Sequence, residues 1–155
     1  MVNKVYSWEN DTNTCKPMNS KNLFKIFHQN IRGLKSKVDD ISNSLRPDYP
    51  HILCLTEHHL KNFEVDNLPI DRYKLGSKFC RHKNAGVCIL VQEDLDFSSI
   101  SLDNYCKEKD IEACAARLKV TPIQLILLAI YRSTSGNFFK FSEKPRQYFE
   151  HLAQY

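Results

Sequence analysis

The segment from residue 23 to residue 57 constrains the fold most, because it alternates between strand and helix patterns. Its first part, residues 23–29 (LFKIFHQ), is a short β-prone run that ends at Asn30. After Gly33, four apolar residues recur at intervals of four, three and four: Leu34, Val38, Ile41 and Leu45. This spacing predicts one apolar face on a helix, and Pro47 ends that helix.

A second strand is predicted over residues 51–56 (HILCLT), and it ends at Glu57. Two strands joined by a helix form a crossover connection, in which both strands run in the same direction. The C-terminal ends of the two strands then meet at one edge of the sheet. We therefore expect Asn30 and Glu57 to lie side by side.

Further strands follow without another clear helix, so the chain is predicted to be an α/β protein. The expected strands cover residues 73–78, 86–92, 111–120 and 123–131. A helix is expected over residues 142–155, with Tyr148, Phe149 and Leu152 packed against the protein. Residues 1–20 are rich in Asn, Thr, Lys and Ser and are predicted to be a flexible tail, which leaves residues 21–155 as the domain.

The amino-acid composition indicates more about the cellular compartment of the protein than about its function. The 155 residues carry a net charge of +4, a mild basic excess that suits a polyanionic partner without requiring one. The six cysteines include no C-x-x-C pair and follow no hydrophobic signal peptide, so reduced thiols in a nuclear or cytoplasmic protein are expected. The longest apolar run, Ile123 to Tyr131, is too short for a membrane helix, and no membrane partner is expected.

Glu57 is the first candidate for chemistry, because a carboxylate at the end of a buried strand is costly unless a cation or hydrogen-bond donors offset its charge. Mg²⁺ prefers oxygen ligands and needs only one or two carboxylates when water and substrate phosphate complete its coordination. The amide of Asn30 can bond a phosphate oxygen or a metal-bound water. The alternative is a carboxylate bonded by backbone N–H groups and an asparagine that serves only its turn.

Several motifs in order resemble the opening of non-LTR retrotransposon endonuclease domains, which belong to the endonuclease/exonuclease/phosphatase superfamily. The first two are residues 28–34 (HQNIRGL) and 52–60 (ILCLTEHHL). The resemblance continues through residues 79–81 (FCR), 85–89 (AGVCI), 110–112 (DIE), 129–132 (AIYR) and 135–137 (SGN). It spans about residue 23 to the C-terminus, and an ordered set is more specific than any single motif.

The resemblance implies the four-layer α/β sandwich of the deoxyribonuclease I-like type and phosphodiester hydrolysis with Mg²⁺ or Mn²⁺. It assigns metal binding to Glu57, orientation of the phosphate or the attacking water to Asn30, and a contact with the scissile phosphate to Tyr131. Arg132 is expected beside them as a phosphate ligand. Arg81 and Lys35 are candidates for the DNA backbone, although charges near turns are often only solvated surface.

The family's later Gly-Asp-Phe-Asn and Ser-Asp-His motifs have no counterpart before Tyr155. Those motifs supply the remaining carboxylates and the acid–base histidine, so the chain is expected to be a partial domain, inactive alone. Its parent would nick DNA and be fused to a reverse transcriptase. Two alternatives stay open: a non-catalytic remnant that binds nucleic acid or protein, and a hydrolase of phosphoinositides or other small phosphodiesters with the same fold.

A sandwich cut in its middle leaves open strand edges and apolar faces, so the chain is expected to self-associate.

His58 and His59 next to Glu57 suggest zinc, but adjacent residues of an extended chain point to opposite faces and do not easily share one ion.

Overall fold

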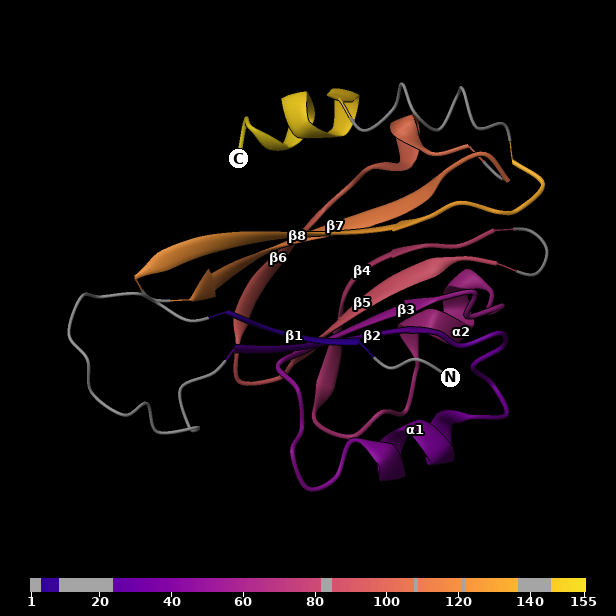
Figure 1. Ribbon diagram of the computed structural model, residues 1–155, viewed down its shortest axis with the longest axis vertical. Helices are drawn as coiled ribbons and strands as arrows, with labels where there is room; N and C mark the ends of the chain where they lie inside the picture. The colour runs from indigo at the N-terminus through magenta and orange to yellow at the C-terminus, as the bar shows by residue number, and fades with distance from the viewer. Residues whose placement is uncertain (1–3, 9–23, 82–84, 108, 121, 137–145) are drawn as a thin grey trace.

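A computed structural model describes residues 4–8, 24–81, 85–107, 109–120, 122–136 and 146–155. Its two sheets pack face to face and carry helices on their outer sides (Figure 1), which confirms the four-layer α/β arrangement. Sheet A has the order β1-β2-β3-β5-β4, with bounds Lys4–Trp8, Phe24–Asn30, Ile52–Thr56, Val87–Gln92 and Tyr73–Phe79. Sheet B has the order β6-β7-β8, with bounds Asp96–Ile100, Glu112–Val120 and Ile123–Tyr131.

The helices are short. Helix α1 covers Val38–Ser44, α2 covers Asn62–Asp66, the 3₁₀ helix η2 covers Asp103–Tyr105, and residues 146–152 form a helix on the outer face of sheet B. No helix among the residues that the structure describes has the length and apolar character to cross a membrane.

The predicted crossover is present. Strands β2 and β3 are parallel, with α1 between them in the chain, and Asn30 pairs with Thr56 at the end of the ladder. The backbone N–H of Ile31 continues the pairing to Thr56 O at 2.9 Å. Glu57, the next residue, therefore follows directly at the edge where Asn30 ends β2.

The alternation along β3 explains why this strand is apolar throughout. Leu53 and Leu55 belong to the core under the helices, whereas Ile52 and Cys54 belong to the core between the sheets. All five residues of β3 are buried because both of its faces are covered. A third cluster lies between sheet B and residues 146–152, and it includes Ile100, Ile111, Ala115, Tyr148 and Leu152.

Four features differ from the sequence predictions. Lys4–Trp8 form β1, antiparallel to β2, so the predicted flexible tail is wrong for these residues; the rest of the tail lies outside the described residues. Strand β6 and helix α2 were not predicted, because each has five residues, too few to show a clear period. Phe149, expected to pack, is 64% exposed, while Tyr148 and Leu152 do pack. The start of the predicted 142–155 helix lies outside the described residues.

The cysteines agree with the predicted role as core side chains. Those described form no disulfide, and Cys54, Cys88 and Cys114 are buried. Burial raises the pKa of Cys54 to about 12, so its thiol stays protonated at neutral pH.

Candidate functional site

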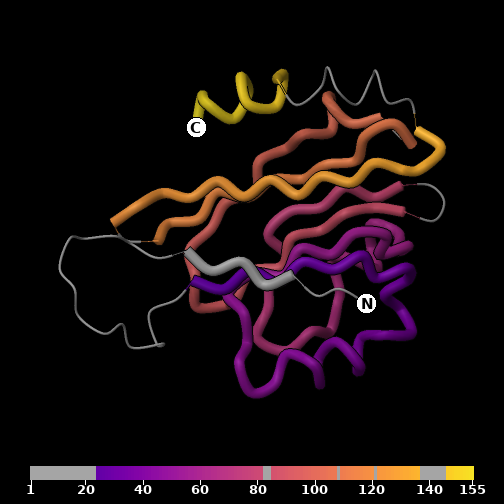
Figure 2. Tube along the Cα trace, viewed as in Figure 1, coloured from indigo at the N-terminus to yellow at the C-terminus, as the bar shows by residue number. Residues whose placement is uncertain are grey.

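The ends of three strands bring Asn30, Glu57 and Tyr131 together. Tyr131, the last residue of β8, donates its hydroxyl hydrogen to Glu57 Oε1 at 2.6 Å, although the two lie 74 positions apart. The side chain of Asn30, the last residue of β2, also hydrogen bonds to the Glu57 carboxylate. The segments after β2, β3 and β8 lie at one end of the sandwich (Figure 2).

The environment of Glu57 keeps its carboxyl group ionised. Burial by itself would raise the pKa of Glu57, but hydrogen bonds from Tyr131 and Asn30, with the nearby charges of His59 and Arg32, hold it below the usual range. Burial, followed by the bond to Glu57, raises the pKa of Tyr131 to about 12. At neutral pH a protonated phenol therefore donates to a charged carboxylate.

Three residues of the site hold left-handed backbone conformations that only glycine adopts without strain. The φ angles are 47° at Arg32, 55° at Glu57 and 58° at His59. Each such residue costs on the order of 1 kcal/mol, and strained positions of this kind cluster at functional sites. The strain at Glu57 turns the chain sharply where β3 ends.

Backbone hydrogen bonds hold this strained turn in place. The N–H of Gly33 donates to Glu57 O at 2.8 Å, and the N–H of Leu34 donates to His58 O at 2.9 Å. On the other side, the N–H of His59 donates to Ala85 O at 2.9 Å. The turn after β3 is therefore fixed between the segment after β2 and the β4–β5 connection.

A buried ion pair lies beside the three strand ends. Glu112, fully buried, accepts from Arg81 Nη1 at 3.3 Å and from the N–H of Gly86 at 2.8 Å. Glu112 pairs with Tyr131 in the β7–β8 ladder, so these two side chains project from the same face. Sequence reasoning assigned Glu112 no role; the signal that it carried was a carboxylate at the start of a strand that continues with four small apolar residues.

The basic residues expected to contact DNA have different surroundings. The side chain of Arg81 is 10% exposed and faces Glu112 in the protein. Lys35 is 82% exposed and pairs with Glu64 at 3.0 Å. Arg132 Nη1 donates to the backbone oxygens of Ser133 and Gly136 at 3.3 and 3.4 Å. Lys35 is therefore open to solvent, whereas Arg81 is not.

A divalent cation fits the Glu57 site only in part. Glu57 supplies one ionised carboxylate at a partly exposed position, and an amide stands beside it, which is donor chemistry that Mg²⁺ accepts. No group of three or more His, Cys, Asp or Glu in the described part of the chain is arranged to hold a metal ion. The neighbouring histidines diverge, since His58 is buried and His59 is exposed.

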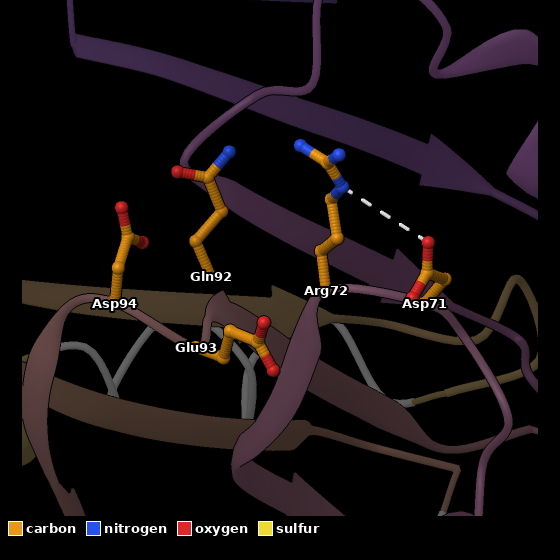
Figure 3. Close-up of a pocket in the computed structure, with 5 residues that line it drawn as sticks. All are labelled: Asp71, Arg72, Gln92, Glu93 and Asp94. Atoms are coloured by element: carbon orange, nitrogen blue, oxygen red, sulfur yellow. Dashed lines mark ion pairs between the residues drawn. The ribbon is translucent and has the colours of Figure 1, made fainter.

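A cavity among the described residues lies at the other end of the sheet. It measures about 370 Å³ and is lined by Asp71, Arg72, Gln92, Glu93 and Asp94, which precede β4 or end and follow β5 (Figure 3). The side chains of the adjacent residues Asp71 and Arg72 form an ion pair at 4.0 Å. None of the predicted site residues lines this cavity, so its size does not mark the Glu57 site.

Among the solved structures similar to this chain, two align with more than four fifths of it. The endonuclease domain of TRAS1, a telomere-specific non-LTR retrotransposon, matches 82% of the chain with 10% identity and a TM-score of 0.60. The AP endonuclease LMAP from Leishmania major matches 84% with 16% identity and a TM-score of 0.62. This chain covers 52% and 49% of those two chains, about half of each. No protein-family model matches the chain, and no curated protein matches its sequence. The chain therefore has the endonuclease/exonuclease/phosphatase fold.

Proposed function

We propose, from the endonuclease/exonuclease/phosphatase fold of this chain, that it is the N-terminal part of a Mg²⁺-dependent DNA endonuclease domain of retrotransposon type. The observation that carries this proposal is the 2.6 Å hydrogen bond from Tyr131 to Glu57, with Asn30 bonded to the same carboxylate. Three polar side chains from three separate strand ends meet, and two of them hydrogen bond to the third, the ionised carboxylate of Glu57. A carboxylate with only a structural role does not require that convergence.

Each residue has a distinct part in the proposed site. Glu57 holds the metal ion, and the Tyr131 hydroxyl and the Asn30 amide fix the direction of its carboxylate. When bound, Mg²⁺ polarises phosphate oxygens and lowers the pKa of a coordinated water. The Asn30 amide has a second N–H for a phosphate oxygen that approaches Glu57, whereas Tyr131, protonated at neutral pH, can donate to that oxygen only by giving up its bond to Glu57.

Lys35 and Arg132 are the proposed phosphate contacts around this centre. Lys35 is exposed and follows the Asn30 segment, and Arg132 directly follows Tyr131. A lysine neutralises the backbone as a point charge, whereas an arginine can bond two phosphate oxygens. Arg81 is left out of this set, because its guanidinium is paired with Glu112 away from solvent.

We propose that this chain hydrolyses DNA poorly by itself. It spans about half of each of these two structures, and no group of three or more His, Cys, Asp or Glu among the described residues is arranged to hold a metal ion. General acid–base help is typically worth about 10²–10⁴ in rate, and among the described residues the exposed His59 is the only candidate for it beside Glu57. A fused reverse transcriptase and a nuclear or cytoplasmic location belong to the same proposal.

The half-length match also favours a second candidate, a non-catalytic remnant that binds nucleic acid or protein. Such a remnant would keep the basic surface and lose the metal. Metal affinity therefore separates the two candidates better than cleavage does.

The experiment measures Mn²⁺ binding by electron paramagnetic resonance with the purified chain, followed by nicking of supercoiled plasmid in Mg²⁺. The proposal expects a single site that Glu57→Ala removes and that Glu93→Ala, in the distant cavity, preserves. Binding that survives Glu57→Ala would refute the metal assignment, and a wild-type chain that binds no Mn²⁺ would favour the remnant. Rapid nicking that depends on Glu57 would refute the claim that the chain is inactive alone.

A further inference from the structure

We propose that the buried ion pair between Arg81 and Glu112 positions Glu57, acting through the backbone of Ala85 and Gly86. Both residues act on Glu57 through other groups, so both are positioning residues. The inference rests on the proposed function only in taking Glu57 as the metal ligand. The proposed route runs from Glu112 in sheet B, through Gly86 and Ala85 between β4 and β5, to the strained turn after β3.

Glu112 uses both of its oxygens within the protein. Its Oε1 accepts from Arg81 Nη1 at 3.3 Å, and its Oε2 accepts from the N–H of Gly86 at 2.8 Å. The Glu112 side chain is 0% exposed and that of Arg81 is 10% exposed. A buried carboxylate needs such partners, so the position of Gly86 is tied to that of Glu112.

The β4–β5 connection passes this constraint to the residues that follow Glu57. Gly86 O accepts from the N–H of His58 at 3.4 Å, and Ala85 O accepts from the N–H of His59 at 2.9 Å. These two bonds hold the chain directly after Glu57, where the backbone is already in a strained conformation. A shift of Gly86 therefore moves the support of Glu57.

A second route from Glu112 reaches the same carboxylate. Glu112 lies opposite Tyr131 in the β7–β8 ladder, and Tyr131 donates to Glu57 Oε1 at 2.6 Å. Both routes start at Glu112, the first through its side chain and the second through its strand pairing, and both end at Glu57. The ion pair thus holds Glu112, the residue that both routes share.

Gly86 is the residue of this route that has no space for a side chain. Its φ is +96°, and a Cβ atom placed there would lie 2.4 Å from Nε2 of His58. Only glycine lets the backbone approach the His58 ring closely enough to bond Glu112 on one side and His58 N–H on the other. Because these packed groups leave little free space, a displacement of Gly86 also displaces His58.

The simpler interpretation is that Arg81 only neutralises a buried carboxylate, with no effect on Glu57. Amide hydrogen exchange separates the two interpretations, because it reports opening at individual bonds. The variants are Glu112→Gln, which removes the charge and keeps the shape, and the paired Arg81→Met/Glu112→Leu, which avoids a lone buried charge. Tyr73→Phe is the control, since it removes a buried hydrogen bond to Pro50 O at the other end of the sheet.

We expect exchange of the His58 and His59 amides to rise about tenfold or more relative to the Gln92 amide, which donates to His51 O at the distant end. The paired variant is expected to show the larger rise and Tyr73→Phe none. Mn²⁺ affinity is expected to fall severalfold in the same order. Equal acceleration of all three amides in the ion-pair variants would overturn the positioning role.

The two proposals fail in different ways. A wild-type chain without Glu57-dependent Mn²⁺ binding would contradict the proposed function, and the exchange rates would still decide the positioning role. Selective loosening without any change in Mn²⁺ affinity would show that the ion pair orders the turn but does not position Glu57 for metal, which also overturns the inference.

Discussion

Acidification provides a direct test of how His58 is buried. Its ring is fully buried, its Nδ1 accepts from the N–H of Leu60 at 3.0 Å, and the Gly86 backbone lies against Nε2. Burial lowers the pKa of His58 from 6.5 to about 4. The folded protein therefore keeps a neutral ring at pH values where the unfolded chain already binds a proton.

The sign and size of the effect follow from linkage. Because the folded pKa is lower than the unfolded one, the stabilisation is complete above pH 6.5 and is lost as pH falls from 6.5 to 4. The difference of about 2.5 pKa units corresponds to roughly 3 kcal/mol at 1.36 kcal/mol per unit. Below pH 4 both states bind the proton and this contribution no longer changes.

Urea unfolding followed by circular dichroism at pH values from 7.5 to 4 measures this loss. His58→Asn, which keeps an acceptor for the Leu60 N–H and cannot titrate, is expected to show a profile flatter by about 3 kcal/mol across that range. His59→Asn, changed one residue further along at an exposed position, is expected to follow the wild type. Identical profiles for wild type and His58→Asn would refute the reasoning.

Three other predictions concern the same end of the sandwich and the open edge of sheet B. Gly86→Ala should destabilise the fold by about 2 kcal/mol or more, because its Cβ would lie 2.4 Å from the His58 ring at a φ of +96°. Urea unfolding measures this change, and a loss of unfolding free energy near zero would contradict the prediction. Tyr131→Phe should raise the pKa of the Glu57 carboxyl by removing its donor, as an NMR titration of the carboxyl carbon would detect; an unchanged pKa would contradict the bond. The chain should self-associate through β8, the outer strand of sheet B as described, so sedimentation should depend on concentration and Ile123→Lys should weaken that dependence; a wild-type monomer at all concentrations would refute it.

The first half of the site was predictable from local patterns. Residues 23–57 alternate strand, helix and strand, and a crossover between parallel strands places both strand ends at one edge, so Asn30 and Glu57 were expected together. The structure confirms the parallel pairing. Tyr131 could be added only through the family resemblance, because no local pattern links it to a residue 74 positions away.

The ion pair could not be predicted in the same way. Arg81 was expected at the DNA surface, and its charge and position near a turn are equally consistent with burial against Glu112. No local sequence pattern indicates that Arg81 and Glu112 meet, because Arg81 follows β4 of sheet A and Glu112 begins β7 of sheet B.

By itself, the amino-acid sequence determined where α1 and six of the strands (β2, β3, β4, β5, β7 and β8) run, because hydrophobic periodicity is read within a few neighbouring residues. The tertiary structure alone decided which groups meet: Glu57 with Tyr131, Glu112 with Arg81 and Gly86, and β1 with the edge of β2. Whether a side chain is apolar enough to be buried is a property of its own segment. The partner of a buried charge or a strand edge depends on how distant segments pack, and that is settled only when the two sheets come together.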